Sequence, residues 1–400
     1  MKKHLLSTSA IALGVAMAAP AAAQEWDVSF GGFMSQHIGY ADIGGTVAAG
    51  RDLDGVDIHS STEIIFTPSI TLDNGLTFGV NVQLEGENAG NSQIDESYMT
   101  ISSDTLGRIV VGSENSAGYS LMTSAPVVTS MAINSPSIST FIPFSGVETS
   151  GGDGIFGFRQ AGLSSFTEVG GNNDVQRLTY YTPSFNGLTL GVSYAPTGDV
   201  NVGNSFNVDK NQVLSDIFDI GVNYSQTFGT TTVTLAARYG TGSAPSYSTV
   251  TNTGPGPDGL NGTADDLSVT TTTLNTDSDP ETWGVGAQIG FGAFAIGASY
   301  AENDNGALDG AGDSEGWNLG MTYDIAGPWA VEAVTYQGEV DTGAFKADYE
   351  AYRIGASRDL GPGVDWDIYV AYVNADNGEV GVDRSTVDGT VIGTGINLSF

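Results

Sequence analysis

Residues 216–228 read DIFDIGVNYSQTF and alternate between apolar and polar positions. The apolar positions are Phe218, Ile220, Val222, Tyr224 and Phe228, and the polar positions between them are Asp219, Gly221, Asn223, Ser225 and Thr227. A period of two predicts a β-strand with one apolar face. Because the second face is polar along its whole length, this strand is expected to separate an apolar medium from water.

The same alternation recurs along the chain and predicts sixteen strands. They cover 26–41, 57–72, 75–85, 93–103, 107–112, 174–183, 187–195, 216–228, 231–240, 282–290, 293–300, 315–326, 328–337, 348–359, 364–373 and 388–400. Short connections rich in Gly, Asn and Asp alternate with long polar ones, as in barrels that have short turns on one rim and loops on the other.

These patterns predict an all-β fold, a closed antiparallel 16-stranded transmembrane β-barrel. A soluble β-sandwich or β-solenoid is the alternative. In a sandwich only the apolar face needs explaining, whereas a barrel with lipid outside and water inside explains both faces and leaves no sheet edge. The 16 Tyr, 17 Phe, 5 Trp and 56 Gly, with few charges, also suit strands with an aromatic girdle.

The N-terminus has the pattern of a secretory signal peptide over residues 1–23. Lys2 and Lys3 precede an apolar run over 5–19, and small residues follow at 21–23. A membrane anchor is the weaker alternative, because a spanning helix needs roughly 20 apolar residues. The mature barrel is therefore expected to cover 24–400 and, since the chain has no Cys, to lack disulfides and a lipid-anchored start.

The charge is strongly acidic, with 12 Lys and Arg against 46 Asp and Glu. Removing Lys2 and Lys3 changes the net charge from −34 to −36. This field repels nucleic acid and anionic solutes, so a nucleic-acid partner is not expected. The acids are either solvated loop residues or the source of a preference for cations.

The last predicted strand, 388–400, ends on an aromatic residue at the chain terminus. Its outward-facing end contains Ile396, Leu398 and Phe400. An apolar strand that ends in this way resembles the signal read by the outer-membrane barrel assembly machinery. The alternative is an ordinary edge strand that happens to end in Phe.

Four stretches carry a resemblance to a known family. They are VSFGGFMSQHIGYAD at 28–42, TLDNGLTFGVNVQLEGENAGNSQIDESYMT at 71–100, LGRIVVGSENSAGY at 106–119 and DVQRLTYYTPSFNGLTLGVSYAP at 174–196. The chain resembles the general diffusion porins of alphaproteobacteria. The resemblance implies sixteen strands, a homotrimer, a place in the outer membrane among its lipid and lipopolysaccharide, and a long third loop folded into the pore.

Residues 113–173 are the predicted constriction loop, since about sixty residues without alternation are too many for an idle hairpin connection. Its acids are Glu114, Glu148, Asp153 and Glu168. Acidic side chains in a narrow water-filled passage lower the barrier for cations. The alternative is an external loop that covers the mouth.

Three arginines fall on the polar face of their strands: Arg108, Arg177 and Arg353. Opposite loop carboxylates they would create a transverse field across the pore, as in related porins. Equally, they could form salt bridges that fix the loop to the wall, and both readings remain open.

The long loop 241–281 contains GPGPDGLNGTADD at 254–266, where Asp258, Asp265 and Asp266 offer hard oxygen ligands for Ca²⁺. Solvated loop acids are the simpler interpretation, and no other cofactor is expected. His37 and His59, the histidines of the mature chain, fall on the polar faces of neighbouring strands. We interpret them as wall residues rather than a catalytic or metal pair.

Together these features predict an outer-membrane pore for small hydrophilic solutes and ions that prefers cations. The alternatives are a substrate-specific porin and a non-conducting structural or adhesive barrel. An outer-membrane protease or lipase is disfavoured, because no GxSxG motif and no Cys accompany the two histidines.

Overall fold

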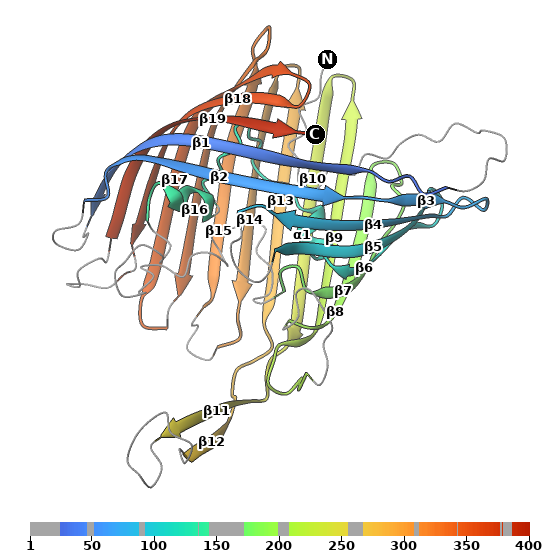
Figure 1. Cartoon of the computed structure of the whole chain (residues 1–400), viewed down its shortest axis with the longest axis vertical. Helices are drawn as coiled ribbons and strands as arrows, with labels where there is room; N and C mark the ends of the chain where they lie inside the picture. Colours follow the sequence, from blue (N-terminus) through green and yellow to red (C-terminus); the bar gives the residue numbers. More distant parts are fainter. Residues whose placement is uncertain are drawn as a thin grey trace.

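The computed structural model describes residues 25–45, 52–87, 93–134, 136–143, 172–198, 208–254, 267–307, 312–341, 343–376, 378 and 386–400. Antiparallel strands form a closed ring in which each strand pairs with its neighbour in the sequence and β19 returns to β1 (Figure 1). The first half contains β1 (Phe30–Gly45), β2 (Gly55–Phe66), β3 (Ser69–Thr71), β4 (Thr77–Glu85), β5 (Ile94–Ser103), β6 (Gly107–Ser113), β7 (Gln176–Tyr181), β8 (Leu188–Thr197), β9 (Ser215–Phe228) and β10 (Thr231–Ser243). The second half contains β13 (Glu281–Phe291), β14 (Phe294–Asp304), β15 (Ser314–Asp324), β16 (Trp329–Asp341), β17 (Lys346–Gly361), β18 (Val364–Asp376) and β19 (Thr386–Ser399).

The ring has sixteen strands, because β2 and β3 are two pieces of one strand in a 17-stranded sheet. Both pieces pair with β4, and Pro68 stands between them. Proline has no N–H to donate to the ladder, which explains the interruption. The Pro68 carbonyl still accepts the N–H of Val80 at 2.9 Å. The predicted fold class and strand count are confirmed.

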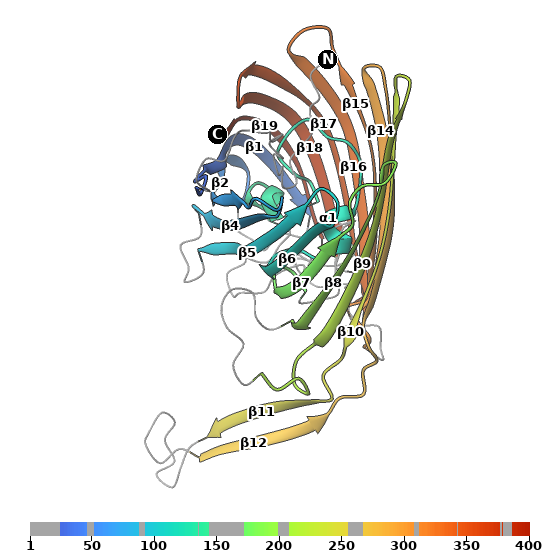
Figure 2. The same ribbon diagram turned by 90° about the vertical axis from the view of Figure 1, so that its right-hand side faces the viewer.

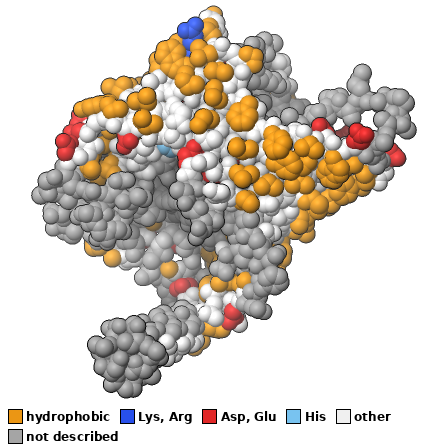
Figure 3. Space-filling view, viewed as in Figure 1, with side chains coloured by type: hydrophobic (Ala, Val, Ile, Leu, Met, Phe, Trp, Pro, Cys, Tyr) orange, Lys and Arg blue, Asp and Glu red, His pale blue; other side chains and the backbone are white. Residues whose placement is uncertain are grey.

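The strands expose their apolar side chains on the outer face and bury polar side chains inside, the reverse of the arrangement in a soluble protein. In β9, Phe218 and Ile220 are 52% and 47% exposed, whereas Asp219 between them is 3% exposed. The outward apolar residues of the other strands are exposed in the same way, and Figure 3 shows hydrophobic side chains gathered over the outer wall. An outer wall of this kind requires lipid as its solvent.

Aromatic pairs mark both rims of the wall. Near the short turns they include Phe291–Phe294 and Trp329–Trp366, with ring centroids 5.6 Å apart in each pair. Towards the long connections they include Trp283–Tyr300 at 5.3 Å. Amphipathic rings of this kind suit the two interfaces of a bilayer.

The connection between β10 and β13 contains a hairpin that the alternation pattern did not predict. It consists of β11 (Tyr247–Gly254) and β12 (Leu267–Leu274) and projects away from the ring (Figures 1 and 2). Its Thr-rich strands have too little apolar alternation to stand out from a polar loop. Among the described residues, no helix is long and apolar enough to cross a membrane.

The chain terminus completes the ring. Phe400 donates its N–H to the Gly32 carbonyl at 3.1 Å, and the Gly32 N–H returns to the Phe400 carbonyl at 3.0 Å. The predicted outward positions hold, since Ile396, Leu398 and Phe400 are 39%, 38% and 69% exposed. Their role as an assembly signal stays a prediction.

Candidate functional site: the inner wall and the segment that follows it

Residues 116–134 and 136–142 follow the inner wall of the ring, and Figure 2 shows the helix of this segment among the strands. The segment contains α1 (Ala117–Leu121) and the 3-10 helix η1 (Pro136–Thr140). Its contacts pass around the ring in chain order, from β8 and β9 through β13, β15 and β16 to β18, β19, β1 and β2. We call residues 116–134 and 136–142 the wall segment.

The wall segment begins with a capped turn. The Ser116 side chain accepts the Tyr119 N–H at 3.2 Å, as an N-cap residue does. Within the same turn, the Gly118 N–H donates to Asp219 of β9. Asp219 also pairs with Arg238 of β10, with Nη2 and Oδ2 2.9 Å apart and both side chains buried. Asp219 therefore neutralises the charge of Arg238 between the wall segment and the strands.

Strand glycines allow the segment to lie this close to the wall. A Cβ atom on Gly221 would lie 2.6 Å from the Ala117 carbonyl oxygen, and one on Gly286 would lie 2.0 Å from the Thr123 carbonyl oxygen. These distances are too short for any other residue. Strand glycines therefore mark the points where the backbone of another segment comes closest to the wall.

Farther along, Glu332 of β16 holds the middle of the segment. Its carboxylate accepts the N–H groups of Val128 and Thr129 and the Thr129 hydroxyl, which lies 2.6 Å from Oε1. Arg353 of β17 donates from Nε to the same Oε1 at 2.6 Å. Arg353 faces inward as its parity predicts, but it is 2% exposed and lies behind the segment.

The next anchor is Asp367 of β18. Its Oδ2 accepts the Ser130 N–H at 2.8 Å and the Asn397 side-chain N–H at 2.7 Å. The Ser130 hydroxyl donates to Asn397 Oδ1 at 2.6 Å and lies 2.9 Å from His37 Nε2. Three strands, β18, β19 and β1, thus converge on one serine of the segment.

Beyond Ser130 the segment is held by apolar packing. Met131, Ile133, Ile138, Phe141 and Ile142 are at most 3% exposed. They form a cluster with inward side chains of β16 to β19, which include Tyr336, Tyr349, Val373 and Val391. This cluster is a small hydrophobic core inside the barrel, so it fixes this part of the segment by burial.

The start of the segment lies beside an acidic group. Glu114 follows β6 and is 8% exposed. Burial raises the pKa of its carboxyl group, and the Tyr98 hydroxyl, Arg108 and Arg177 partly offset this effect. Arg177 donates to the Asn172 carbonyl, and the Arg108 guanidinium lies 4.5 Å from the centre of the Tyr181 ring.

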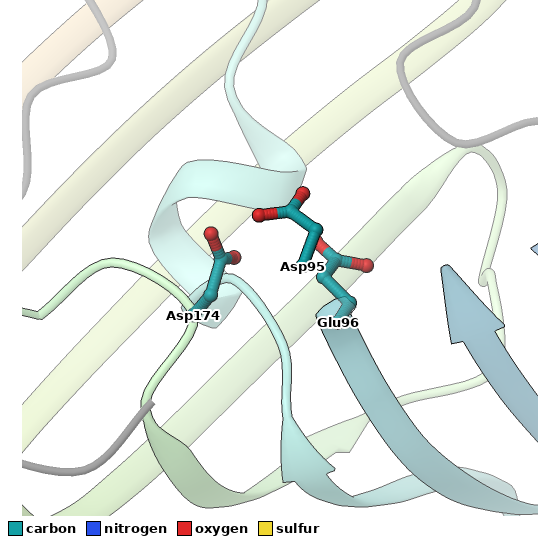
Figure 4. Close-up of side chains that lie close together, drawn as sticks. All are labelled: Asp95, Glu96 and Asp174. Carbon is teal, nitrogen blue, oxygen red and sulfur yellow. The ribbon is translucent and has the colours of Figure 1, made fainter. Parts of the chain in front are cut away.

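Asp95, Glu96 and Asp174 place one carboxylate oxygen each within 4.8 Å of the others (Figure 4). Oxygen atoms in this arrangement can hold a divalent cation. Both Glu96 oxygens already accept hydrogen bonds, from Gln83 and, at 2.7 Å, from Asn115. The side-chain amides of Gln83 and Asn115 thus stabilise the Glu96 carboxylate of this cluster.

Several predicted site residues lie outside the described residues. They are Glu148, Asp153 and Glu168 of the constriction loop and Asp258, Asp265 and Asp266 of the predicted Ca²⁺ loop. The constriction role of 113–173 and the Ca²⁺ site therefore stay predictions. Of the constriction residues that are described, Glu114, Arg108 and Arg177 share one side of the wall, and Arg353 lies apart with Glu332.

Four residues that hold the segment were not predicted as site residues from the sequence: Asp219, Asn318, Glu332 and Asp367. The sequence does place each of them at an inward-facing position of a strand, and each is polar or charged. A charge at such a position needs water or a partner. The alternation pattern cannot distinguish water from a protein partner, because the partner comes from a distant part of the chain.

The chain belongs to the Gram-negative porin family, whose model matches residues 7–378. Porins of this family are outer-membrane channels, and the inside-out ring described above is their fold. No curated protein matches the sequence significantly.

Solved structures support the fold. The chain is similar to the outer membrane protein OmpT of Vibrio cholerae in a trimer form, with 12% identity and a TM-score of 0.56, covering 94% of this chain and 99% of that one. It is similar to an anion-selective porin from Comamonas acidovorans, with 16% identity, a TM-score of 0.54 and coverage of 94% and 100%. It is also similar to the channel DcaP of Acinetobacter baumannii, with 14% identity, a TM-score of 0.56 and coverage of 94% and 97%.

Proposed function

We propose that the chain forms a passive, cation-preferring channel for small hydrophilic solutes and ions. The observation that carries this proposal is the wall segment inside the ring. A segment held flat against the wall narrows the passage and leaves a water-filled remainder, where radius and lining charge determine what passes. As in alphaproteobacterial general porins, the rest of 113–173 would complete the constriction.

The cation preference rests on how the charges of the wall are balanced. The guanidinium groups of Arg238 and Arg353 are neutralised by Asp219 and Glu332. Glu63 and Glu85 stand directly opposite each other on β2 and β4, on the inward face. Carboxylates that face the passage would attract cations and repel anions.

The proposed setting is the outer membrane of a Gram-negative bacterium, reached after removal of residues 1–23 and assembled by the barrel assembly machinery. We propose a homotrimer with lipid and lipopolysaccharide around it. The trimer form of the similar OmpT structure supports this state. The proposed role is transport, with no enzymatic activity.

The test is conductance of the refolded protein in planar bilayers under a KCl gradient. We expect stepwise ion currents, a reversal potential on the cation side and, in liposomes, sugar uptake that declines smoothly with size. Glu63→Gln with Glu85→Gln should reduce the cation preference, whereas Glu339→Gln near the rim of β16 should not. A protein without currents would contradict the channel, and one sugar class that enters faster than its size allows would indicate a substrate-specific porin.

A further inference from the structure

His37 and His59 form a pair on the inner wall. They are direct cross-strand partners on β1 and β2, and their ring centroids lie 6.3 Å apart. Each ring contacts a hydroxyl group of the wall segment. His37 Nε2 lies 2.9 Å from Ser130 Oγ, and His59 Nδ1 lies 2.9 Å from Thr140 Oγ1. The two imidazoles therefore hold both ends of residues 130–140.

His37 has almost no freedom to adapt. It is 1% exposed, and its ring lies flat over Gly395 of β19, where a Cβ atom would stand only 2.2 Å from Nδ1. Nδ1 is buried and has no hydrogen-bond partner. A charged imidazolium carries N–H on both nitrogens, so its Nδ1 proton would have no acceptor. Charging this ring consequently favours a shift away from Gly395.

The charges around the pair permit one added proton more easily than two. His37 faces Asp367, Arg353, Tyr369 and Asn397 on β17 to β19, and His59 faces Glu87. Asp367 already accepts hydrogen bonds from Ser130 and Asn397, and Arg353 adds positive charge on the same side. Two protonated rings at directly opposed positions repel each other.

We propose that His37 and His59 are a pH-sensitive latch on the wall segment. With neutral rings, both hydroxyl contacts hold residues 130–140 against the wall. When falling pH charges both rings, their repulsion and the unpaired Nδ1 proton loosen these residues. The effect on current rests on the proposed function, because a loosened segment would obstruct the passage and the two new charges would oppose cations.

The first experiment compares currents at about pH 7.5 and about pH 4.5, because buried imidazoles take up a proton at lower pH than exposed ones. For the natural chain we expect closures to become roughly threefold more frequent at the lower pH, since opposed like charges have an effect of this order. His59→Gln keeps a hydrogen-bonding side chain beside Thr140 and should remove this increase. Thr140→Val keeps both histidines and should raise closures already at the higher pH.

The second experiment measures the mobility of the wall segment directly and does not depend on channel current. Hydrogen exchange of peptides over 128–140 is compared between the natural chain and His59→Gln at the same pH, so that intrinsic exchange rates cancel. We expect faster exchange in the natural chain at about pH 4.5 and equal exchange at about pH 7.5. Equal exchange at both values, or closures in His59→Gln that rise as in the natural chain, would overturn the latch. A chain that carries no current at either pH contradicts the proposed channel, and the exchange comparison still decides the latch.

Discussion

Arg353 and Glu332 form an ion pair on neighbouring strands of the inner wall, with side chains 1% and 0% exposed. Glu332 simultaneously binds the backbone of Val128 and Thr129. The arginine therefore supplies the charge that a buried carboxylate needs, and the carboxylate uses its remaining lone pairs on the wall segment. Of the two roles considered for this arginine, a salt bridge that fixes the loop is the one its geometry fits.

Breaking this pair should loosen the segment. Glu332→Gln removes the charge that balances Arg353 and weakens the bonds to Val128 and Thr129, so we expect a loss of about 3 kcal/mol in the free energy of unfolding. Urea unfolding followed by tryptophan fluorescence measures it. Glu339→Gln on the same strand, whose partner Lys346 is 63% exposed, should change little. Equal losses in both variants would show that the buried pair has no special role.

The barrel itself could be predicted from the sequence because the alternating residues of each strand show which face contacts lipid and which contacts water. The stretch at 216–228 places Phe218 in lipid and Asp219 inside without reference to any other segment. The wall segment could not be traced in this way. Its contacts, such as Gly118 with Asp219 or Ser130 with Asp367, join residues 101 and 237 positions apart. Only the long-range fold brings such polar groups together, so the sequence indicated a loop but not its path.

Arg108 is the inward arginine best placed to act on permeating ions, because it is only half-buried. Arg108→Ala should raise the permeability of K⁺ relative to Cl⁻ by roughly twofold, since one charge near a watery passage contributes on the order of 1 kcal/mol or less. The reversal potential in a KCl gradient measures the ratio. Arg358→Ala is the matched control, because this arginine lies against Trp329 on the outer face. A shift of the same size in both variants would contradict a lining role for Arg108.

Gly395 supports the ring of His37, and this contact can be tested by adding one methyl group. Gly395→Ala would push Cβ into the imidazole, so we expect a loss of about 2 kcal/mol in unfolding free energy from overpacking. In Gly290→Ala the nearest atom, the Phe294 carbonyl oxygen, is 3.9 Å away and little change is expected. Adding His37→Ala to Gly395→Ala should restore part of the loss. Independent, additive effects of the two substitutions would argue against the contact.

The predicted Ca²⁺ loop at 254–266 is tested by calorimetric titration of the refolded chain. Solvated loop acids, the simpler interpretation, give no heat, whereas a Ca²⁺ site at Asp258, Asp265 and Asp266 would bind with a dissociation constant on the order of 1 mM, as for weak extracellular sites. Replacing all three with Asn would then abolish the heat, whereas Asp209→Asn in another loop would not. If the natural chain gives no heat, or the triple variant gives the same heat, these aspartates are solvated loop acids.

Phe400 has two separable contributions, one from its backbone and one from its ring. The backbone exchanges two hydrogen bonds with Gly32 and completes the β1–β19 ladder, whereas the ring is 69% exposed on the outer face. Phe400→Ala keeps the backbone bonds, so the protein refolded in detergent should unfold at nearly the natural urea concentration. Its amount in outer membranes of expressing cells should nevertheless fall several-fold if the ring is read during assembly. Deletion of Phe400 should lower both quantities, because each lost hydrogen bond costs on the order of 1 kcal/mol. Natural levels of Phe400→Ala in the outer membrane would leave the terminal ring without a role in assembly and restrict Phe400 to closing the barrel.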